Sequence, residues 1–334
     1  YTITYTSTDG KAVTLNKTDG FGANIISNTY DDTRAGVITF DAPVTTIGAS
    51  AFEGCTTLRS IIIPNSVKSI EEDAFAKCSA LRDVSISASV TTISTNPFTD
   101  CVNLASITVE EGNTVYDSRN DCNAIIETAS NTLLVGCKST IIPEDVKKIG
   151  YSAFYGCINL KAITIPTSVE LVERAAFHNT GITSITIPAN TTLQGGAMVG
   201  ATIEGVFTEC KELESVSIEA GLSHIPSAGF GGCTKLSVIN IPNTVESIGR
   251  MAFFGCSALK SITFPQSVTS LEDMAFGGCS SLKAVNVNAF FPPALGNGTF
   301  TSSPTCTIPC GTITLYQASD WNDQVGKFVV GECA

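Results

Sequence analysis

The sequence predicts a β-solenoid, an array of stacked coils that each contribute one short strand to a parallel sheet. Two observations predict this fold. A Phe-x-x-Cys phrase recurs every 23 residues, beginning at Phe52, and a fixed period of about 20–29 residues is the signature of a stacked-coil protein. Each phrase is also followed by the same apolar skeleton, as in Leu58-x-x-Ile61-x-Ile63-Pro64. The phenylalanines of the array are Phe52, Phe75, Phe98, Phe154, Phe177, Phe207, Phe230, Phe253 and Phe276.

Residues 1–40 precede the first phrase and are predicted to form an N-terminal β-hairpin cap. Their first segment, Tyr1–Leu15, consists of two alternating runs around Asp9 and Gly10. An Asp-Gly pair between alternating runs is a strong hairpin signal. A cap is expected here because the open end of an array exposes its core and an unpaired strand edge.

Residues 41–110 are predicted to be repeats. Ile61 and Ile63 alternate with period two, so both face the core, and Pro64 ends the strand because it lacks an amide donor. A single coil buries a few side chains at about 1.5–3 kcal/mol each, which does not offset the ordering of its backbone. Stacking is expected to place the repeat leucines in one core column and the phenylalanines in a second. The leucines are Leu58, Leu81, Leu104, Leu160, Leu213, Leu236, Leu259 and Leu282.

Residues 111–142 are predicted to be a hairpin inserted in the array. The spacing from Phe98 to Phe154 is 56 residues, ten more than two repeats, and the extra segment is expected to turn at residues 128–131. The two cysteines that bracket this hairpin could face each other across it and form a disulfide. The pairing of all five cysteines outside the repeat position stays open: Cys122, Cys137, Cys306, Cys310 and Cys333.

Residues 143–290 are predicted to continue the repeats, and residues 291–334 to form a C-terminal cap. The spacing from Phe177 to Phe207 is 30 residues, so we expect a loop over Ala189–Gly205, which is rich in Gly and Thr. The final segment lacks the repeat phrase, which is why we assign it to a cap.

Eight cysteines occupy one and the same position of the repeat. A small thiol that recurs once per coil indicates a buried packing residue, and the chain has no Cys-x-x-Cys spacing of the kind that binds zinc. We therefore expect these thiols to be reduced and buried, and we expect no metal site. They are Cys55, Cys78, Cys101, Cys157, Cys210, Cys233, Cys256 and Cys279.

The repeat phrase resembles that of the BspA-like leucine-rich repeat family of bacterial cell-surface proteins of the Bacteroides type. The resemblance covers roughly residues 41–290 and is closest over Leu236–Cys256. It implies a leucine-rich-repeat solenoid, curved and right-handed. It also implies an extracellular or cell-surface protein whose signal peptide has been removed. The matching positions are Ile239, Ile241, Pro242, Val245, Ile248, Gly249, Ala252 and Phe253.

Charge and hydropathy argue against a nucleic-acid partner and against a membrane-spanning segment. The net charge of −12 argues against nucleic acid. No stretch of 18 or more apolar residues occurs, so no membrane-spanning segment is expected. We also expect a monomer.

The sequence predicts neither a catalytic residue nor a cofactor, and we expect no enzyme. The two histidines, His178 and His224, lie beside no nucleophile motif, and His178 is expected to be a solvated turn residue. The phosphate-binding glycine loop, the Gly-x-Ser-x-Gly elbow and the His-Glu-x-x-His motif are all absent from the sequence. A glycan-active enzyme assembled from distant carboxylates is the least favoured function.

The outward positions of the predicted strands are mostly small and polar, and they include no Trp, Tyr or Arg, the residues that dominate protein hot spots. A ladder of this kind keeps a sheet soluble or offers a weak platform. These positions are Ser60, Ile62, Asp83, Ser85, Ser106, Thr108, Ala162, Thr164, Ser184, Thr186, Ser215, Ser217, Val238, Asn240, Ser261, Thr263, Ala284 and Asn286.

The position after the repeat leucine is basic in five of nine coils. These residues are Arg59, Arg82, Lys161, Lys260 and Lys283. Stacking should place Arg59 beside Arg82, and Lys260 beside Lys283. The row either neutralises neighbouring acidic loops or contacts an anionic partner such as an acidic glycan or a matrix protein.

Taken together, the residues and the resemblance predict a secreted or surface-attached binding protein, used for adhesion or for recognition of a protein or glycan ligand. The ligand is not identified by the sequence. The alternative is a structural spacer or recognition domain within a larger surface assembly.

Overall fold

The computed structural model describes residues 1–32, 34–199 and 202–332 of the chain. It divides into two units, Tyr1–Ile163 and Thr164–Ala334. Each unit is a β-solenoid whose parallel strands recur with the 23-residue repeat, as the sequence predicts.

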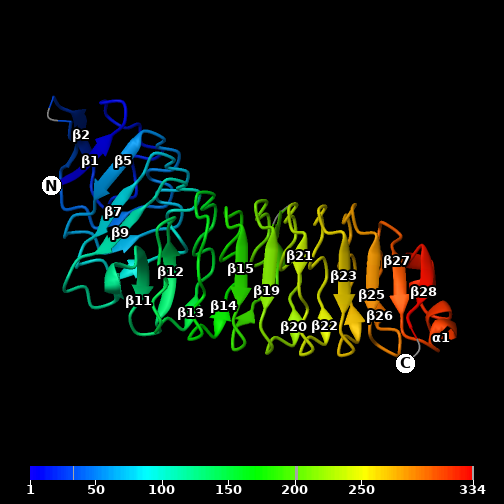
Figure 1. The fold of residues 1–334 in the computed structure, drawn as a ribbon. Coiled ribbons are helices and arrows are strands. Elements are labelled where there is room, and N and C mark those ends of the chain that lie inside the picture. The colour runs from blue at the N-terminus through cyan, green and yellow to red at the C-terminus, as the bar shows by residue number, and fades with distance from the viewer. Residues whose placement is uncertain (33, 200–201, 333–334) are drawn as a thin grey trace. The chain divides into compact units, whose positions relative to one another are not determined.

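Unit 1 has a long strand and a two-residue strand in each of its first coils. Its longer strands form one sheet in the order β2-β3-β1-β5-β7-β9 (Figure 1). The parallel register sets Ile61 opposite Val84 and Val84 opposite Ile107. The strands of this sheet are β1 (Thr2–Ser7), β2 (Ile25–Tyr30), β3 (Gly36–Phe40), β5 (Leu58–Ile62), β7 (Asp83–Ile86) and β9 (Ser106–Val109). The short strands are β4 (Thr46–Ile47), β6 (Ser69–Ile70) and β8 (Thr92–Ile93).

The predicted hairpin over Tyr1–Leu15 is wrong. Strand β1 runs antiparallel between β3 and β5, and no strand follows it before β2. Val13 turns into the core instead, where its backbone N–H donates to the hydroxyl of Tyr5 at 3.2 Å. Strand β1 pairs with β5 in place of forming a local hairpin, because this pairing covers the open strand edge of the first coil.

The inserted segment of unit 1 contains the hairpin that the sequence predicts at this turn. Strand β11 (Ala124–Glu127) pairs antiparallel with β12 (Thr132–Gly136). The same sheet includes β10 (Tyr116–Asp117) and β13 (Lys148–Ile149), and a 3-10 turn, η1, spans Arg119–Asp121. The bracketing cysteines Cys122 and Cys137 are buried free thiols and form no disulfide.

Unit 2 presents its strands side by side in chain order (Figure 1). The sheets are β15-β19-β21, β23-β25-β27-β28 and β20-β22-β24-β26, with the smaller pairs β14-β16 and β17-β18. Residues 161–166 form no strand, so Ala162 and Thr164 are not strand positions. The strands are β14 (Leu171–Val172), β15 (Ser184–Ile187), β16 (Thr192–Leu193), β17 (Ala197–Val199), β18 (Thr202–Glu204), β19 (Ser215–Ile218), β20 (His224–Ile225), β21 (Val238–Ile239), β22 (Ser247–Ile248), β23 (Ser261–Phe264), β24 (Ser270–Leu271), β25 (Ala284–Val287), β26 (Ala294–Leu295), β27 (Thr305–Ile308) and β28 (Lys327–Val330).

Two short helices close the C-terminal end of unit 2, α1 (Ile313–Gln317) and α2 (Trp321–Gln324). Tyr316 and Trp321 on these helices are fully buried. The Tyr316 hydroxyl donates to the carbonyl of Ala289 at 2.7 Å, and the Trp321 indole N–H donates to the carbonyl of Pro293 at 2.8 Å. Both large side chains therefore lie against the last coils with their polar atoms satisfied.

The two predicted core columns are confirmed. Every repeat leucine is at most 2% exposed and every repeat phenylalanine at most 3%. Neighbouring rings stack, with centroids 5.0 Å apart for Phe52 and Phe75 in unit 1 and 5.3 Å apart for Phe207 and Phe230 in unit 2. Such aromatic pairs add about 0.5–1.5 kcal/mol beyond burial.

The repeat cysteines are buried and reduced, as predicted, and the structure adds a reason for their identity. The Cys78 thiol donates to the carbonyl of Phe52 at 3.0 Å, and the Cys256 thiol donates to that of Phe230 at 3.3 Å. A thiol can donate weakly where alanine could not. The same bond to the phenylalanine one coil earlier is made by Cys101, Cys210, Cys233 and Cys279.

Three cysteines lie near the C-terminus. Cys306 is a buried free thiol. Cys310 is disulfide-bonded, and Cys333 lies outside the described residues.

We expect the eight repeat thiols to react slowly with a maleimide while the protein is folded. All are buried, and burial raises the pKa of Cys55 and Cys279 to about 12. For these two thiols, about one group in ten thousand is the reactive thiolate at pH 8. Mass spectrometry after timed labelling measures this, with the urea-unfolded protein as the fully reactive control. Rapid labelling of Cys78 or Cys256 in the native protein would contradict the assignment.

Candidate functional site

The basic row is present in unit 1 as an adjacent pair of arginines. Arg59 lies in β5 and Arg82 immediately precedes β7. The backbone N–H of Arg82 donates to the carbonyl of Arg59 at 2.8 Å, which fixes the two residues one coil apart. Both are exposed. Neither guanidinium makes a salt bridge to any residue that the structure describes.

The three lysines of the basic row differ in their hydrogen bonds. In unit 2 the backbone N–H of Lys283 donates to the carbonyl of Lys260 at 2.9 Å, so these exposed lysines also form the predicted pair. Lys161, in unit 1, donates instead from its ammonium group to the carbonyl of Ile158 at 3.0 Å. The row therefore consists of two pairs and one lysine that is bonded to its own coil.

A hollow of about 560 Å³ lies beside Arg59 in unit 1 and brings in a second arginine, Arg34. Thr6, Ser7 and Thr8 also line it, and their hydroxyl groups bond Ser60, Lys11 and Thr57 within the chain. Among the described residues that line it, none is acidic. The hollow thus combines two cationic groups with hydroxyls that can donate or accept hydrogen bonds.

The connection between β2 and β3 positions Arg34. The Tyr30 hydroxyl donates to the carbonyl of Arg34 at 3.0 Å and accepts from the backbone N–H of Ser7 at 3.3 Å. Sequence reasoning missed Arg34 because it lies in the cap, outside the repeat. No motif links it to Arg59.

Several other surface cations are neutralised by carboxylates. Lys77 contacts Glu53 at 2.8 Å, and Lys235 contacts Glu212 at 2.6 Å. The hydrogen bond from Lys77 lowers the pKa of Glu53. Arg34, Arg59 and Arg82 contrast with these pairs because their charge is not matched within the described chain.

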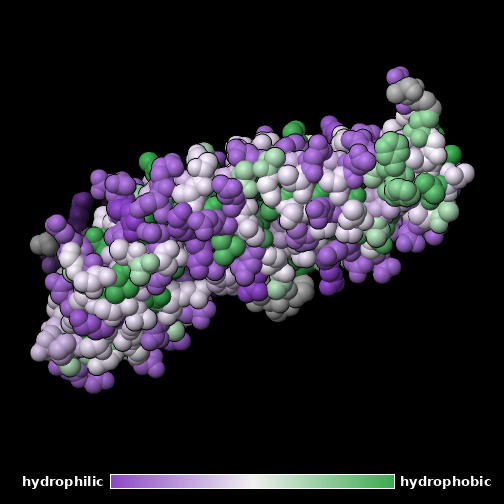
Figure 2. Space-filling model, turned by 90° about the horizontal axis from the view of Figure 1, so that it is seen from below, coloured by the Kyte–Doolittle hydropathy of each residue, from purple (hydrophilic) through white to green (hydrophobic). Residues whose placement is uncertain are grey.

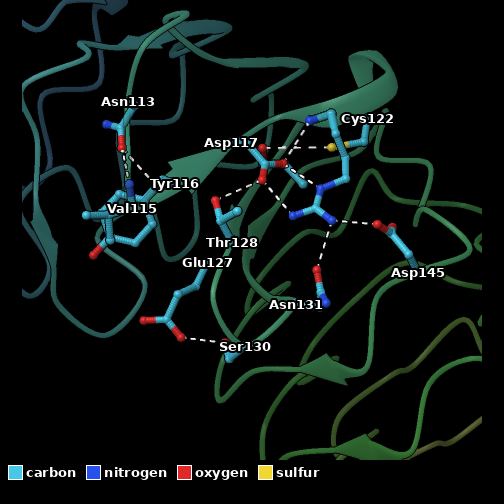
Figure 3. Close-up of polar contacts among 12 residues, drawn as sticks. Asn113, Val115, Tyr116, Asp117, Cys122, Glu127, Thr128, Ser130, Asn131 and Asp145 are labelled. Atoms are coloured by element: carbon cyan, nitrogen blue, oxygen red, sulfur yellow. Dashed lines mark hydrogen bonds and ion pairs between the residues drawn. The ribbon is translucent and has the colours of Figure 1, made fainter.

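Arg119, in the inserted segment, also bonds carboxylates, and its partners Asp117, Asn131 and Asp145 are labelled in Figure 3. Its guanidinium donates to both carboxylate oxygens of Asp117, at 2.8 and 2.6 Å, and to Asn131 at 2.8 Å and Asp145 at 2.5 Å. Burial alone would raise the pKa of Asp117. The hydrogen bonds from Arg119 outweigh this effect, so the pKa of Asp117 lies below its usual value. These contacts fix the η1 turn to the hairpin and use four of the five N–H donors of the Arg119 guanidinium.

The two histidines lie in different surroundings, His178 at a hollow and His224 beside Ser247. His178 was expected to be solvated but is only 7% exposed, and this burial lowers its pKa. It lines a hollow of about 440 Å³ with a single carboxylate, Glu209, and no Ser or Cys among the described lining residues. His224 bonds Ser247 at 2.7 Å. Glycoside hydrolysis ordinarily needs a pair of carboxylates, which this hollow lacks.

The described residues contain neither a candidate metal cluster nor a candidate membrane-spanning helix. No group of three or more His, Cys, Asp and Glu side chains converges there. In that part of the chain no helix has the length and apolar character needed to cross a bilayer.

Apolar side chains gather near the C-terminal end of the face shown in Figure 2, whose surface is otherwise mainly hydrophilic. Near the C-terminal end of the sequence, Phe291 is 77% exposed and Phe290 is 54% exposed. The edge strand β28 adds Val329 and Val330. Phenylalanine and valine side chains carry no group that selects a ligand by charge or by hydrogen bonding, unlike the arginines of unit 1.

One family matches most of the chain. It is described as the BspA type leucine rich repeat region, and six copies match residues 23–129, 134–197 and 202–310. No curated protein matches.

Solved structures of bacterial leucine-rich repeat proteins are similar to this chain. A leucine rich cell surface protein from Faecalibacterium prausnitzii is 28% identical over 73% of this chain, with a TM-score of 0.49, and the alignment spans 57% of that protein. A leucine-rich repeat protein from Bacteroides ovatus is 21% identical, with coverage of 96% and 98% of the two chains and a TM-score of 0.47. The pneumococcal vaccine antigen PcpA is 16% identical, with coverage of 83% and 68% and a TM-score of 0.43.

Proposed function

The chain belongs to the BspA-type leucine-rich repeat family, and from this premise we propose that it is an exported cell-surface protein that binds an anionic partner. The binding surface is the one formed by Arg34, Arg59 and Arg82 in unit 1, which we term the arginine surface. Its contact with a ligand serves adhesion or recognition. No cofactor takes part.

The observation that carries this proposal is the unmatched charge of these arginines. In a chain of net charge −12, these neighbouring guanidinium groups form a local cationic surface, whereas Lys77 and Lys235 are paired with carboxylates. Guanidinium groups bind carboxylate and sulfate oxygens in a bidentate manner. The hydroxyl-lined hollow beside Arg59 adds groups that suit a saccharide. An acidic glycan therefore fits the surface better than an acidic protein segment.

A structural spacer is the second candidate. The mostly small, polar outward positions of the strands favour it, because they offer few side chains that could anchor a partner. A spacer would show no ligand binding at the arginine surface.

We expect the double variant Arg59→Glu with Arg82→Glu to lose binding to a sulfated polysaccharide while its thermal melt stays unchanged. The reversal replaces attraction by repulsion at exposed positions that make no internal ion pair. Binding by the unchanged protein should weaken with added salt, since exposed charges are screened over about 8–10 Å at physiological ionic strength. Surface plasmon resonance on the immobilised polysaccharide measures both effects.

The matched control is Lys260→Glu with Lys283→Glu, which makes the same change of charge in unit 2. We expect this control to retain most of the binding. If the affinity for the polysaccharide changed neither with added salt nor with the arginine reversal, the arginine surface would be ruled out as the binding site. Equal loss in both variants would show that net charge alone governs binding.

A further inference from the structure

The ladder of longer strands in unit 2, β15-β19-β21 and β23-β25-β27-β28, is open between β21 and β23 in the described part of the chain. At the closed junctions the N–H that follows the repeat leucine donates to the carbonyl one coil earlier, as from Ser237 to Glu214 at 3.0 Å and from Lys283 to Lys260 at 2.9 Å. The equivalent bond from Lys260 to Ser237 is missing, and no strand pair joins β21 to β23 in the described chain. We term this junction the seam.

The seam is local, because the same two coils touch on both sides of it. Before the seam, the N–H of Ala258 donates to the carbonyl of Thr234 at 3.1 Å. After it, the N–H of Thr269 donates to the carbonyl of Glu246 at 2.8 Å, and β22 pairs with β24. The opening is therefore a bounded slot in one face of the solenoid and not a break in the array.

Asn240 marks where β21 leaves the ladder. Its side-chain oxygen accepts from the backbone N–H of Ile218 at 3.0 Å, and its amide donates to the carbonyl of the same residue at 3.0 Å. The side chain thus engages both backbone groups of Ile218, the last residue of β19. Strand β21 stops at Ile239, two residues short of the four-residue strands β19 and β23, and Pro242 has no N–H with which to continue the ladder.

The seam opens onto a hollow of about 490 Å³. None of the described residues that line it is charged. Its polar residues are Ser237, Asn240, Asn243, Ser261, Thr263 and Asn288. Core side chains are uncovered there as well: Ile239 and Ile241 are partly exposed, whereas Ile262 and Phe264, their counterparts one coil later, are 3% and 0% exposed.

We propose that the seam binds an extended, uncharged peptide segment as an added strand. Both walls are strand edges that lack a strand partner, and such edges are templates for main-chain hydrogen bonding. The partly uncovered isoleucines offer apolar contacts for alternate side chains of the guest. The uncharged lining disfavours an acidic or basic ligand, because a charge would lose hydration without gaining a partner. This site lies in unit 2 and is separate from the arginine surface.

Residue-resolved hydrogen exchange tests the open junction in the free protein. The amides of Lys260 and Ser261 should exchange at least tenfold faster than those of Lys283 and Ala284, which occupy the same positions one coil later and donate to Lys260. Equal protection at the two junctions would overturn the seam itself.

Binding is tested with a fluorescent ten-residue peptide that carries the sequence of residues 181–190, an uncharged repeat strand of this chain. We expect saturable binding by fluorescence anisotropy and slower exchange of the Lys260 and Ser261 amides when the peptide is present. The same peptide with alternate amides N-methylated keeps its side chains but loses donors, so its affinity should fall at least tenfold.

The protein variant Val238→Glu places a charge in the seam at a side chain that is 62% exposed, so folding should not suffer. It should weaken peptide binding at least tenfold. The matched control is Ile62→Glu, at the outward position of a closed junction in unit 1, where the side chain is 56% exposed. Absence of saturable binding, equal affinity of the methylated peptide, or binding only of a neutral oligosaccharide such as maltoheptaose would overturn the proposal.

Discussion

Replacing Phe253 by Ala is expected to lower the free energy of unfolding by about 3–5 kcal/mol. The Phe253 ring is fully buried and stacks between Phe230 at 5.4 Å and Phe276 at 5.0 Å. Its removal loses apolar transfer energy and leaves a cavity between two rings that the backbone holds in place. Because each coil contacts only its neighbours, the damage should spread first to the coils on either side. Urea denaturation followed by circular dichroism measures the loss.

The control for this substitution is Thr263→Ala, at an exposed position of the adjacent strand β23. Its effect should stay within about 0.5 kcal/mol. If the two variants ranked in the opposite order, the inward and outward positions of the repeat would have been assigned wrongly.

The repeating part of the fold could be predicted from sequence because the same residue type recurs at the same position in many coils. Leu58 and Leu259 occupy the same place in coils of different units, and both are fully buried. The regular period also predicts the strand register, since Ile61 pairs with Val84, which lies one repeat later in the sequence. Local alternation alone would not have fixed either feature.

The N-terminal cap shows where this reasoning fails. Tyr1–Leu15 has an alternating pattern and an Asp-Gly turn, yet β1 pairs with β3 and β5. An alternating pattern predicts that a segment is a strand, but it does not predict which strand the segment pairs with. Here the partner is decided by the exposed edge of the first coil, which no short stretch of sequence reveals.

The same distinction applies to the candidate sites. The Arg59–Arg82 pair could be predicted because both residues hold one repeat position, whereas Arg34 reaches the hollow from a cap that has no period. The seam lies in the coil that follows the family phrase most closely, Leu236–Cys256. Beside it, the Asn240 side chain accepts from the backbone N–H of Ile218 and donates to its carbonyl, and a repeat pattern does not encode such bonds.

Replacing Trp321 by Ala is expected to cost about 3–5 kcal/mol, with the unfolding beginning at the C-terminal coils. The indole is fully buried, with ring centroids 5.5 Å from Phe300 and 5.8 Å from Tyr316. Its removal also strips the carbonyl of Pro293 of its donor, and an unsatisfied buried acceptor costs about 1–3 kcal/mol. Part of that cost is relieved if water enters the opened end.

Position distinguishes this variant from Phe253→Ala. Loss of an interior ring weakens coils on both sides, whereas loss of the cap should raise hydrogen exchange in β25 and β27 and leave β5 and β7 unchanged. The conservative variant Trp321→Phe keeps most of the apolar contact but not the N–H donor, so its loss should be clearly smaller. A loss below about 1 kcal/mol for Trp321→Ala, or exchange that rises evenly along unit 2, would show that the two helices do not close the array, because a closing cap transmits its loss through nearest neighbours.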